Sequence, residues 1–216
     1  MLLALAEALD VPLRARNEIL LAAGFAPIYP ERALTAPEMA LANQVLDRIL
    51  AHHEPYPAMV IDGGWDILVH NRATARIIAH CVPGAALARY RKHGKLNFVR
   101  LMCAPDGLKP HVRGWARTGA VLLARLRREA AAYPGSPSAL LLRELLDARA
   151  FPDFVELADA PLDAVIPLTI EVNGEELRLL NTLTTFGTPQ DVTLQELRIE
   201  LSFPADEATE RLLRSL

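Results

Sequence analysis

Asp62, Asp66 and His70 are the residues whose types and spacing come closest to acid–base chemistry. The two carboxyl groups flank the short turn Gly63-Gly64, and histidine titrates near neutral pH. A hydrolase would also need a nucleophile held beside a base, and the sequence has no G-x-S-x-G elbow for a nucleophilic serine. Acidic side chains are common at hairpin rims without any chemistry. We therefore predict no catalytic residues and a protein that is not an enzyme.

Metal and phosphate sites have equally little support. His52-His53-Glu54 is the only histidine cluster in the sequence, and adjacent helical residues point about 100° apart. The H-E-x-x-H, P-loop and G-x-G-x-x-G motifs do not occur. Cys81 and Cys103 lack the C-x-x-C spacing, which favours a reduced cytoplasmic protein. We expect neither a metal ion nor a cofactor.

The charges are distributed very unevenly along the chain. Residues 67–128 hold ten arginines and three lysines against the single acid Asp106, a net charge of +12, while the remainder carries −15. Such a basic block can bind an anion, dock on acidic segments of its own fold, or face a partner. A nucleic-acid patch is only superficially matched, because Tyr90 is the only aromatic residue among the bases of residues 89–95.

Arg100 is the basic residue best placed to hold an acidic ligand. On a helix, Phe98, Leu101 and Met102 would face inward, and Arg100 would border that apolar face. An arginine at the mouth of an apolar pocket suits a carboxylate, which it binds through two hydrogen bonds. Arg113 is the reserve candidate for this role. Plain core packing remains the alternative for the apolar residues.

The elements that position these residues follow from periodicity and turn signals. Helical spacing predicts helices over residues 2–9, 13–23, 37–53, 72–81, 114–133, 138–148 and 206–216, with a short one at 96–103. Asn71 is the expected cap of the fourth helix. Alternation predicts strands over residues 58–62, 66–70, 165–172, 177–186 and 194–203. The turns are Gly63-Gly64, whose glycines would supply positive φ, and Asn173-Gly174. The class is α+β with one antiparallel sheet.

Length and composition exclude several classes. The chain has 216 residues, 51% of them hydrophobic and 23% charged, which is typical of a globular protein. The longest stretch free of charge, residues 130–142, is shorter than the roughly 18 residues of a membrane helix. We expect no membrane partner.

The N-terminal segment resembles the end of a helix-turn-helix domain of the xenobiotic-response-element type. The similar residues are 5–12, Arg16-Asn17 and 20–24, in the order LAEALDVP, RN and LLAAG. The resemblance implies that further helices, including the recognition helix, precede Leu2 in such a regulator. We therefore expect residues 1–30 to be the remnant of a truncated DNA-binding domain. DNA binding would need the missing region.

Residues 31–216 resemble the MmyB-like ligand-binding domain of bacterial transcription regulators. The similar pieces are residues 55–58, 65–73, 97–100, Trp115, 151–154, 188–192 and 194–199. The resemblance implies a PAS-like domain, with a five-stranded antiparallel sheet covered by helices on one face. It also implies a small apolar ligand such as a long-chain fatty acid, and we expect a cytoplasmic homodimer. A PAS-like dimerisation module without ligand remains the alternative, and a hydrolase is less favoured. The predicted ligand contacts are Asn71, Phe98, Arg100, Leu101, Met102, Arg113, Trp115, Phe154 and Phe186.

Overall fold

The computed structural model describes residues 1–92, 94–151 and 165–216 and confirms the α+β class. Its strands form one sheet in which each pairing is antiparallel. The strands are β1 (Ala58–Ile61), β2 (Asp66–His70), β3 (Arg91–Lys92), β4 (Lys95–Asn97), β5 (Val112–Arg113), β6 (Ile166–Val172), β7 (Glu175–Thr184) and β8 (Arg198–Pro204). Their order across the sheet is β3-β4-β2-β1-β8-β7-β6-β5.

The expected count of five strands is wrong, because eight strands pair within the described residues. The five longest ones, β2-β1-β8-β7-β6, are contiguous in the centre of the sheet. The additional strands β3, β4 and β5 have two or three residues each, too few to show an alternating pattern in the sequence. The PAS-like arrangement stays a prediction.

Two hairpins organise the sheet. Asn173 and Gly174 have φ of 53° and 83°, so both central residues of the β6–β7 turn are left-handed, as a type I′ turn requires. In the β1–β2 hairpin, positive φ was expected at Gly63 and Gly64, and this is wrong. The left-handed residue is Trp65, with φ of 65°, which is unusual for a bulky side chain.

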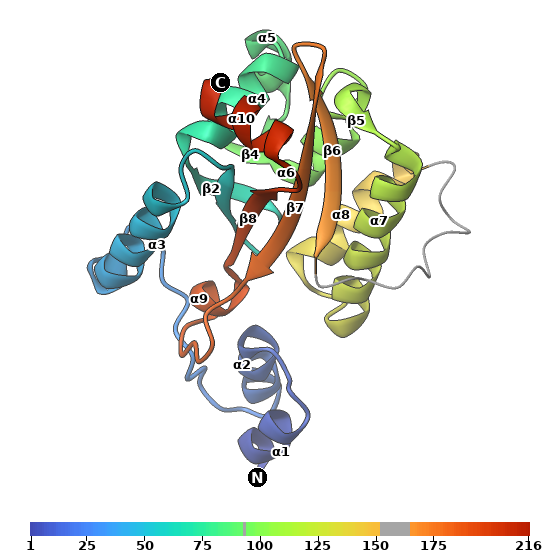
Figure 1. The fold of residues 1–216 in the computed structure, drawn as a ribbon. Helices are drawn as coiled ribbons and strands as arrows, with labels where there is room; N and C mark the ends of the chain where they lie inside the picture. Colours follow the sequence, from blue (N-terminus) through green and yellow to red (C-terminus); the bar gives the residue numbers. More distant parts are fainter. Residues whose placement is uncertain (93, 152–164) are drawn as a thin grey trace.

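The helices cover both faces of the sheet, and not one as expected (Figure 1). On one face lie α4 (Arg72–Cys81), α5 (Gly84–Arg89), α6 (Phe98–Cys103), α7 (Trp115–Ala132) and α8 (Pro137–Asp147). On the other face, α3 (Ala40–His52), which follows the 3-10 turn η1 (Pro37–Met39), packs Leu46 and Leu50 on Val60 and Ile199. Helix α10 (Glu207–Ser215) packs against β7 and β8.

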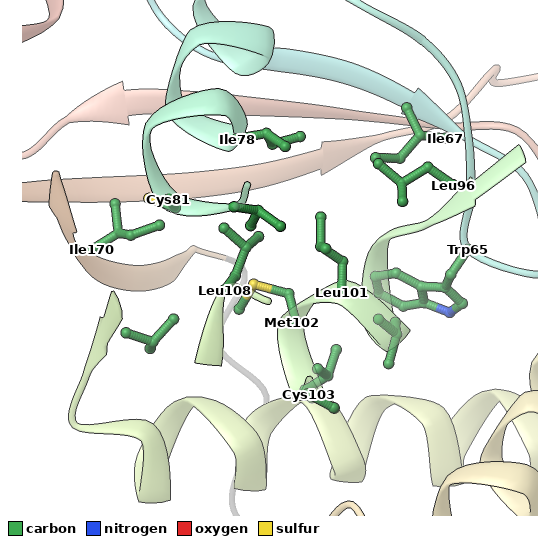
Figure 2. Close-up of a cluster of buried hydrophobic side chains, with 14 of the residues drawn as sticks. Trp65, Ile67, Ile78, Cys81, Leu96, Leu101, Met102, Cys103, Leu108 and Ile170 are labelled. Carbon is green, nitrogen blue, oxygen red and sulfur yellow. The ribbon is translucent and has the colours of Figure 1, made fainter. Parts of the chain in front are cut away.

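The main core lies between the sheet and α4–α8. Figure 2 shows Leu101, Met102 and Leu108 meeting Ile78 and Ile170 in this space. The 3-10 turn η2 (Lys109–His111) connects this region to β5. Among the helices of the described residues, none combines the length and apolar character that crossing a membrane requires.

The expected strand over residues 194–203 is wrong at its beginning. Residues Val192–Glu196 form the short helix α9, and β8 starts at Arg198. The Asp191 side chain accepts a hydrogen bond from the Thr193 amide and caps α9. A helix of five residues is too short to show its period in the sequence. The alternating pattern of the strand therefore predicts a strand that begins too early, at residue 194.

The N-terminal helices α1 (Leu2–Ala8) and α2 (Leu13–Ala22) lie beside α9 at one end of the molecule (Figure 1). Gln195 Oε1 accepts a hydrogen bond from the Leu13 amide at 2.6 Å, so a residue of α9 caps α2. Arg14 Nε donates to Glu196 at 2.7 Å. These contacts connect the first helices to the segment that leads into β8.

Candidate functional site

Two neighbouring cavities lie inside the main core, between the sheet and helices α4, α6 and α7. Their volumes are about 60 and 50 Å³, and Phe98, Met102, Leu168 and Glu200 line both of them. The other lining side chains are apolar except Thr74 and Ser202 in the first cavity and Thr118, Arg125 and Asn181 in the second. Strands β1, β6 and β7 and helix α4 build the first cavity, whereas α7, β6 and β7 build most of the second.

The position of α6 fixes the shared wall. Asn97, only 1% exposed, caps α6 by accepting a hydrogen bond from the Arg100 amide. Its Nδ2 donates to Gly64 O at 2.7 Å and to Asp66 at 2.8 Å. The cap therefore joins α6 to the β1–β2 hairpin, and this places Phe98 and Met102 over the sheet.

Strand β8 contributes the polar part of the site. Its odd-numbered residues Ile199 and Leu201 face α3, so its even-numbered side chains Arg198, Glu200 and Ser202 face the main core. Glu200 is 7% exposed and lies in the wall of both cavities. On a sheet with only one covered face, such a row of polar side chains would meet water. Here helices cover both faces, so the row lines the interior of the protein.

A partly buried charged cluster adjoins the second cavity. Two guanidinium groups lie near the Trp65 ring, with Arg125 at 5.1 Å and Arg198 at 5.2 Å from its centroid. Glu129 joins these groups, because its carboxylate is 2.9 Å from Arg198 Nη1, 3.3 Å from Arg125 Nε and 3.0 Å from Trp65 Nε1. Arg125 lines the second cavity.

Burial controls the protonation of this region. Loss of hydration raises the pKa of Glu200 to about 7, and the nearby positive charge of Arg125 opposes this increase only in part. Burial also lowers the pKa of Arg125. Glu200 can thus be neutral or ionised near neutral pH, and the net charge of the cluster changes with it.

Of the predicted ligand contacts, Phe98 and Met102 line the cavities. Leu101 is fully buried in the core beside them. Asn71 has a structural position: its Oδ1 accepts hydrogen bonds from the amides of Thr74 and Ala58, and its Nδ2 donates to Tyr56 O. The expected cap of α4 is confirmed.

The two arginines predicted to hold a head group are paired elsewhere. Arg100 makes two hydrogen bonds of 2.7 Å to Glu144 on α8, and they raise the pKa of its guanidinium. Arg113 contacts Glu171 and lies 3.8 Å from Glu176. Neither lines a cavity. In this structure, these members of the basic block dock on acidic side chains of their own chain.

The remaining predicted contacts lie apart from the cavities. Trp115 begins α7, packs against the main core and has the Lys109 ammonium 5.6 Å from its ring centroid. Phe186 packs with the smaller cluster on the α3 face. Phe154 lies outside the described residues.

The groups considered for acid–base or metal chemistry hold the hairpin together. Asp62 accepts hydrogen bonds from the amides of Gly64 and Asp66 and pairs with Lys95. His70 Nδ1 lies 3.1 Å from Asn71 O.

In the part of the chain that the structure describes, no group of three or more His, Cys, Asp or Glu side chains could hold a metal ion. Burial raises the pKa of Cys81 to about 11 and that of Cys103 to about 12.

Sequence reasoning missed Glu200, Arg125, Arg198 and Trp65. The alternation of residues 197–203 predicts a strand whose two faces differ, and Arg125 is one of the ten arginines of residues 67–128. Whether such side chains meet water or a cavity depends on what covers the element, and the pattern in the sequence does not contain that information.

The chain matches a known protein family and is similar to a solved structure. The family described as MmyB-like transcription regulator ligand binding domain matches residues 42–216. A solved structure of an RNA-binding light-oxygen-voltage receptor shares 15% sequence identity with a TM-score of 0.33. That match covers 94% of this chain and 45% of the other, so the chain spans less than half of that protein's length. No curated protein matches.

Proposed function

Because the chain belongs to the family of MmyB-like transcription regulator ligand-binding domains, we propose that it senses a small, largely apolar effector in its two interior cavities. The observation that carries this proposal is the pair of largely apolar cavities between the sheet and α4, α6 and α7. A concave, mostly apolar space with a few polar groups is typical of a small-molecule site. A long-chain fatty acid is the first candidate ligand.

The size of the cavities sets a condition on binding. Ligand pockets usually hold roughly 300 to 1,000 Å³, whereas the two cavities hold about 60 and 50 Å³. A long alkyl chain therefore has to move the shared side chains Phe98 and Met102 and join the two spaces. Met102 suits this role because methionine adapts its shape at low cost. Each buried methylene then contributes about 0.8 kcal/mol.

For signalling, the effector must bind more tightly to one state of the regulator than to the other. Strand β8 lines the cavities, and α9, directly before it in the chain, holds α2 through Gln195 and Glu196. This connection supports transmission of the ligand state towards the N-terminal segment. We propose that the complete regulator binds DNA through helices that precede this segment.

Native mass spectrometry of protein purified from cells tests the proposal. We expect co-purified lipid, or an increase in melting temperature with added fatty acids. The L168F variant should fill both cavities and remove lipid uptake. L201F, a change of the same kind at a half-buried residue packed with the α3-face cluster, is the matched control. Absence of lipid together with an unchanged melting temperature would contradict the proposal.

Dimerisation without a ligand is the second candidate, and exposed apolar side chains favour it. Leu21, Phe25 and Ile28 are 57%, 59% and 53% exposed near α2, and Leu41 on α3 is 73% exposed. Patches of this kind often bind another protein chain. Light scattering coupled to size-exclusion chromatography distinguishes a monomer from a homodimer, and F25S should shift a dimer towards the monomer.

A further inference from the structure

Glu200 is the polar group at which the two cavities meet. It lines both, is 7% exposed, and receives no hydrogen bond from any described residue. Most buried polar groups have a hydrogen-bond partner, so a buried carboxyl without one is unusual. The missing partner would have to be a donor, because an ionised carboxylate can only accept.

A second acceptor lies close by on the neighbouring strand. Asn181 is 5% exposed and lines the second cavity, and its Oδ1 has no hydrogen-bond partner within the described part of the chain. Asn181 pairs with Ser202 across β7 and β8, so it is a diagonal neighbour of Glu200 on the same face of the sheet. When Glu200 is ionised, two acceptors without donors thus face the same small space.

The charges around Glu200 do not favour a further anion. From α7 come Arg125 and Glu129, from β8 comes Arg198, and the charges of these groups with an ionised Glu200 sum to zero. The neighbouring residues of β1, β7 and α6 that line the cavities, such as Met59, Leu183 and Phe98, do not titrate. An ionised head group would add an uncompensated buried charge, which is costly.

We propose that Glu200 recognises the head group of the effector by accepting a hydrogen bond, so that the cavity takes amphiphiles whose head group donates one, namely fatty alcohols and un-ionised fatty acids. The inference rests on the proposed effector site and specifies its chemistry. In the complex with an acid, one proton is shared between the ligand carboxyl and Glu200. The hydroxyl of an alcohol donates to the same carboxyl without any proton uptake.

The two ligand types then respond differently to pH. Above the pH at which free Glu200 ionises, binding of an acid takes up one proton, and its dissociation constant rises about tenfold for each pH unit. Below that pH, Glu200 already carries the proton and the dependence disappears. The affinity for an alcohol does not fall in the alkaline range, because an ionised Glu200 is the stronger acceptor.

Three probes of matched size test this on the full chain by isothermal titration calorimetry. Octan-1-ol has a donor, 1-methoxyheptane has the same atoms without a donor, and octanoate is the acid. We expect octan-1-ol to bind at least tenfold more tightly than 1-methoxyheptane, because the unpaired carboxyl penalises the ether. Between pH 7.5 and 8.5, the dissociation constant of octanoate should rise about tenfold.

Two variants separate the role of the carboxyl from general packing. E200Q keeps an acceptor oxygen, so it should keep the preference for octan-1-ol. Its amide N–H also donates to an ionised carboxylate, so octanoate should bind without proton uptake and lose its pH dependence. E200M removes the acceptor and should abolish the preference. E175Q makes the same change as E200Q at an exposed residue of β7 that lines neither cavity, and it is the matched control, with the wild-type pattern expected.

The outcomes distinguish the inference from the function beneath it. Equal binding of octan-1-ol and 1-methoxyheptane by the wild type, or an octanoate affinity that does not change between pH 7.5 and 8.5, would overturn the role of Glu200 alone. Both results come from the wild-type chain and do not depend on folding of a variant. Absence of binding by all three probes would overturn the effector site itself.

Discussion

At the scale of single residues, the interior contains more polar chemistry than its apolar walls suggest. Trp65 is 2% exposed in a left-handed conformation, and the guanidinium groups of Arg125 and Arg198 lie near its ring. A backbone conformation that a bulky residue rarely adopts persists only where the surroundings fix it, and such positions cluster at functional sites. Here the fixing contacts are the Glu129 hydrogen bond and the Phe98 amide, which donates to Trp65 O.

The buried carboxyl of Glu200 predicts an unusual pH dependence of stability. Its pKa is raised from 4.5 to about 7 in the folded protein. The folded state therefore keeps a proton that the unfolded chain loses, and this stabilisation disappears as pH rises from about 4.5 to 7. E200Q removes the ionisation, so its stability relative to wild type should increase over this range, by about 3 kcal/mol in total.

Urea unfolding at pH 4.5 and pH 8 measures this difference. Glu7→Gln, at an exposed position of α1, is the control and should track the wild type at both values. A wild-type protein that is as stable as E200Q at pH 8 would show that Glu200 is not buried as an isolated carboxyl.

At the level of the elements, side chains that do not themselves line the cavities decide how accurately the walls are placed. Asn71 joins the end of β2 to α4 and to the start of β1, since it accepts from the amides of Thr74 and Ala58 and donates to Tyr56 O. Helix α4 supplies Ile77 and Ile78 to the first cavity. Asn71 therefore helps to hold the wall of the first cavity in place.

The N71A variant should lose about 2 to 3 kcal/mol of stability, because it leaves several buried backbone groups without partners. Ser136 provides a matched comparison, since its hydroxyl caps α8 by accepting one hydrogen bond from a backbone amide, that of Ala139, and within the described residues it otherwise bonds only to the Ser138 hydroxyl. S136A should lose only about 1 kcal/mol. Urea unfolding with an unchanged m-value is the measurement. Equal losses in the two variants would show that the additional contacts of Asn71 contribute nothing.

At the scale of the whole molecule, two paths connect the cavities with the N-terminal helices. One runs from Glu200 on β8 to α9, which contacts α2 through Gln195 and Glu196. The other runs along α7, which lines the second cavity, to Tyr133, whose hydroxyl bonds to Glu18 on α2. These are the contacts through which a movement of β8 or α7 would reach α2.

The R14A variant tests how firmly α2 is held. Arg14 pairs with both Glu196 and Glu31, and it is half-buried. Its loss should weaken the docking of α2 by about 1 kcal/mol, which corresponds to roughly fivefold faster amide exchange over residues 13–22. Hydrogen exchange followed by mass spectrometry measures this. R211A removes an exposed pair with Glu207 on α10 and should leave α2 unchanged. Unchanged exchange in R14A as well would mean that Arg14 does not hold α2.

Features that depend on near neighbours in the chain follow from the amino-acid sequence alone. The Asn71 cap, the left-handed Asn173-Gly174 turn and the α+β class follow from local spacing, and the structure confirms them. Phe98 and Met102 were found because their helical face is apolar on its own.

The environments of Glu200, Arg100 and Arg113 depend instead on how segments that are distant in the chain pack together. Glu200 and Arg125 are 75 residues apart in the numbering, and their shared environment exists because α7 covers the polar face of β8 while α3 covers the opposite face. Alternation shows that the two faces of a strand differ, yet a polar face meets water or a cavity according to what packs over it. Likewise, Arg100 pairs with Glu144 and Arg113 pairs with Glu171, and neither arginine lines a cavity. The fold brings these distant acidic side chains beside the two arginines.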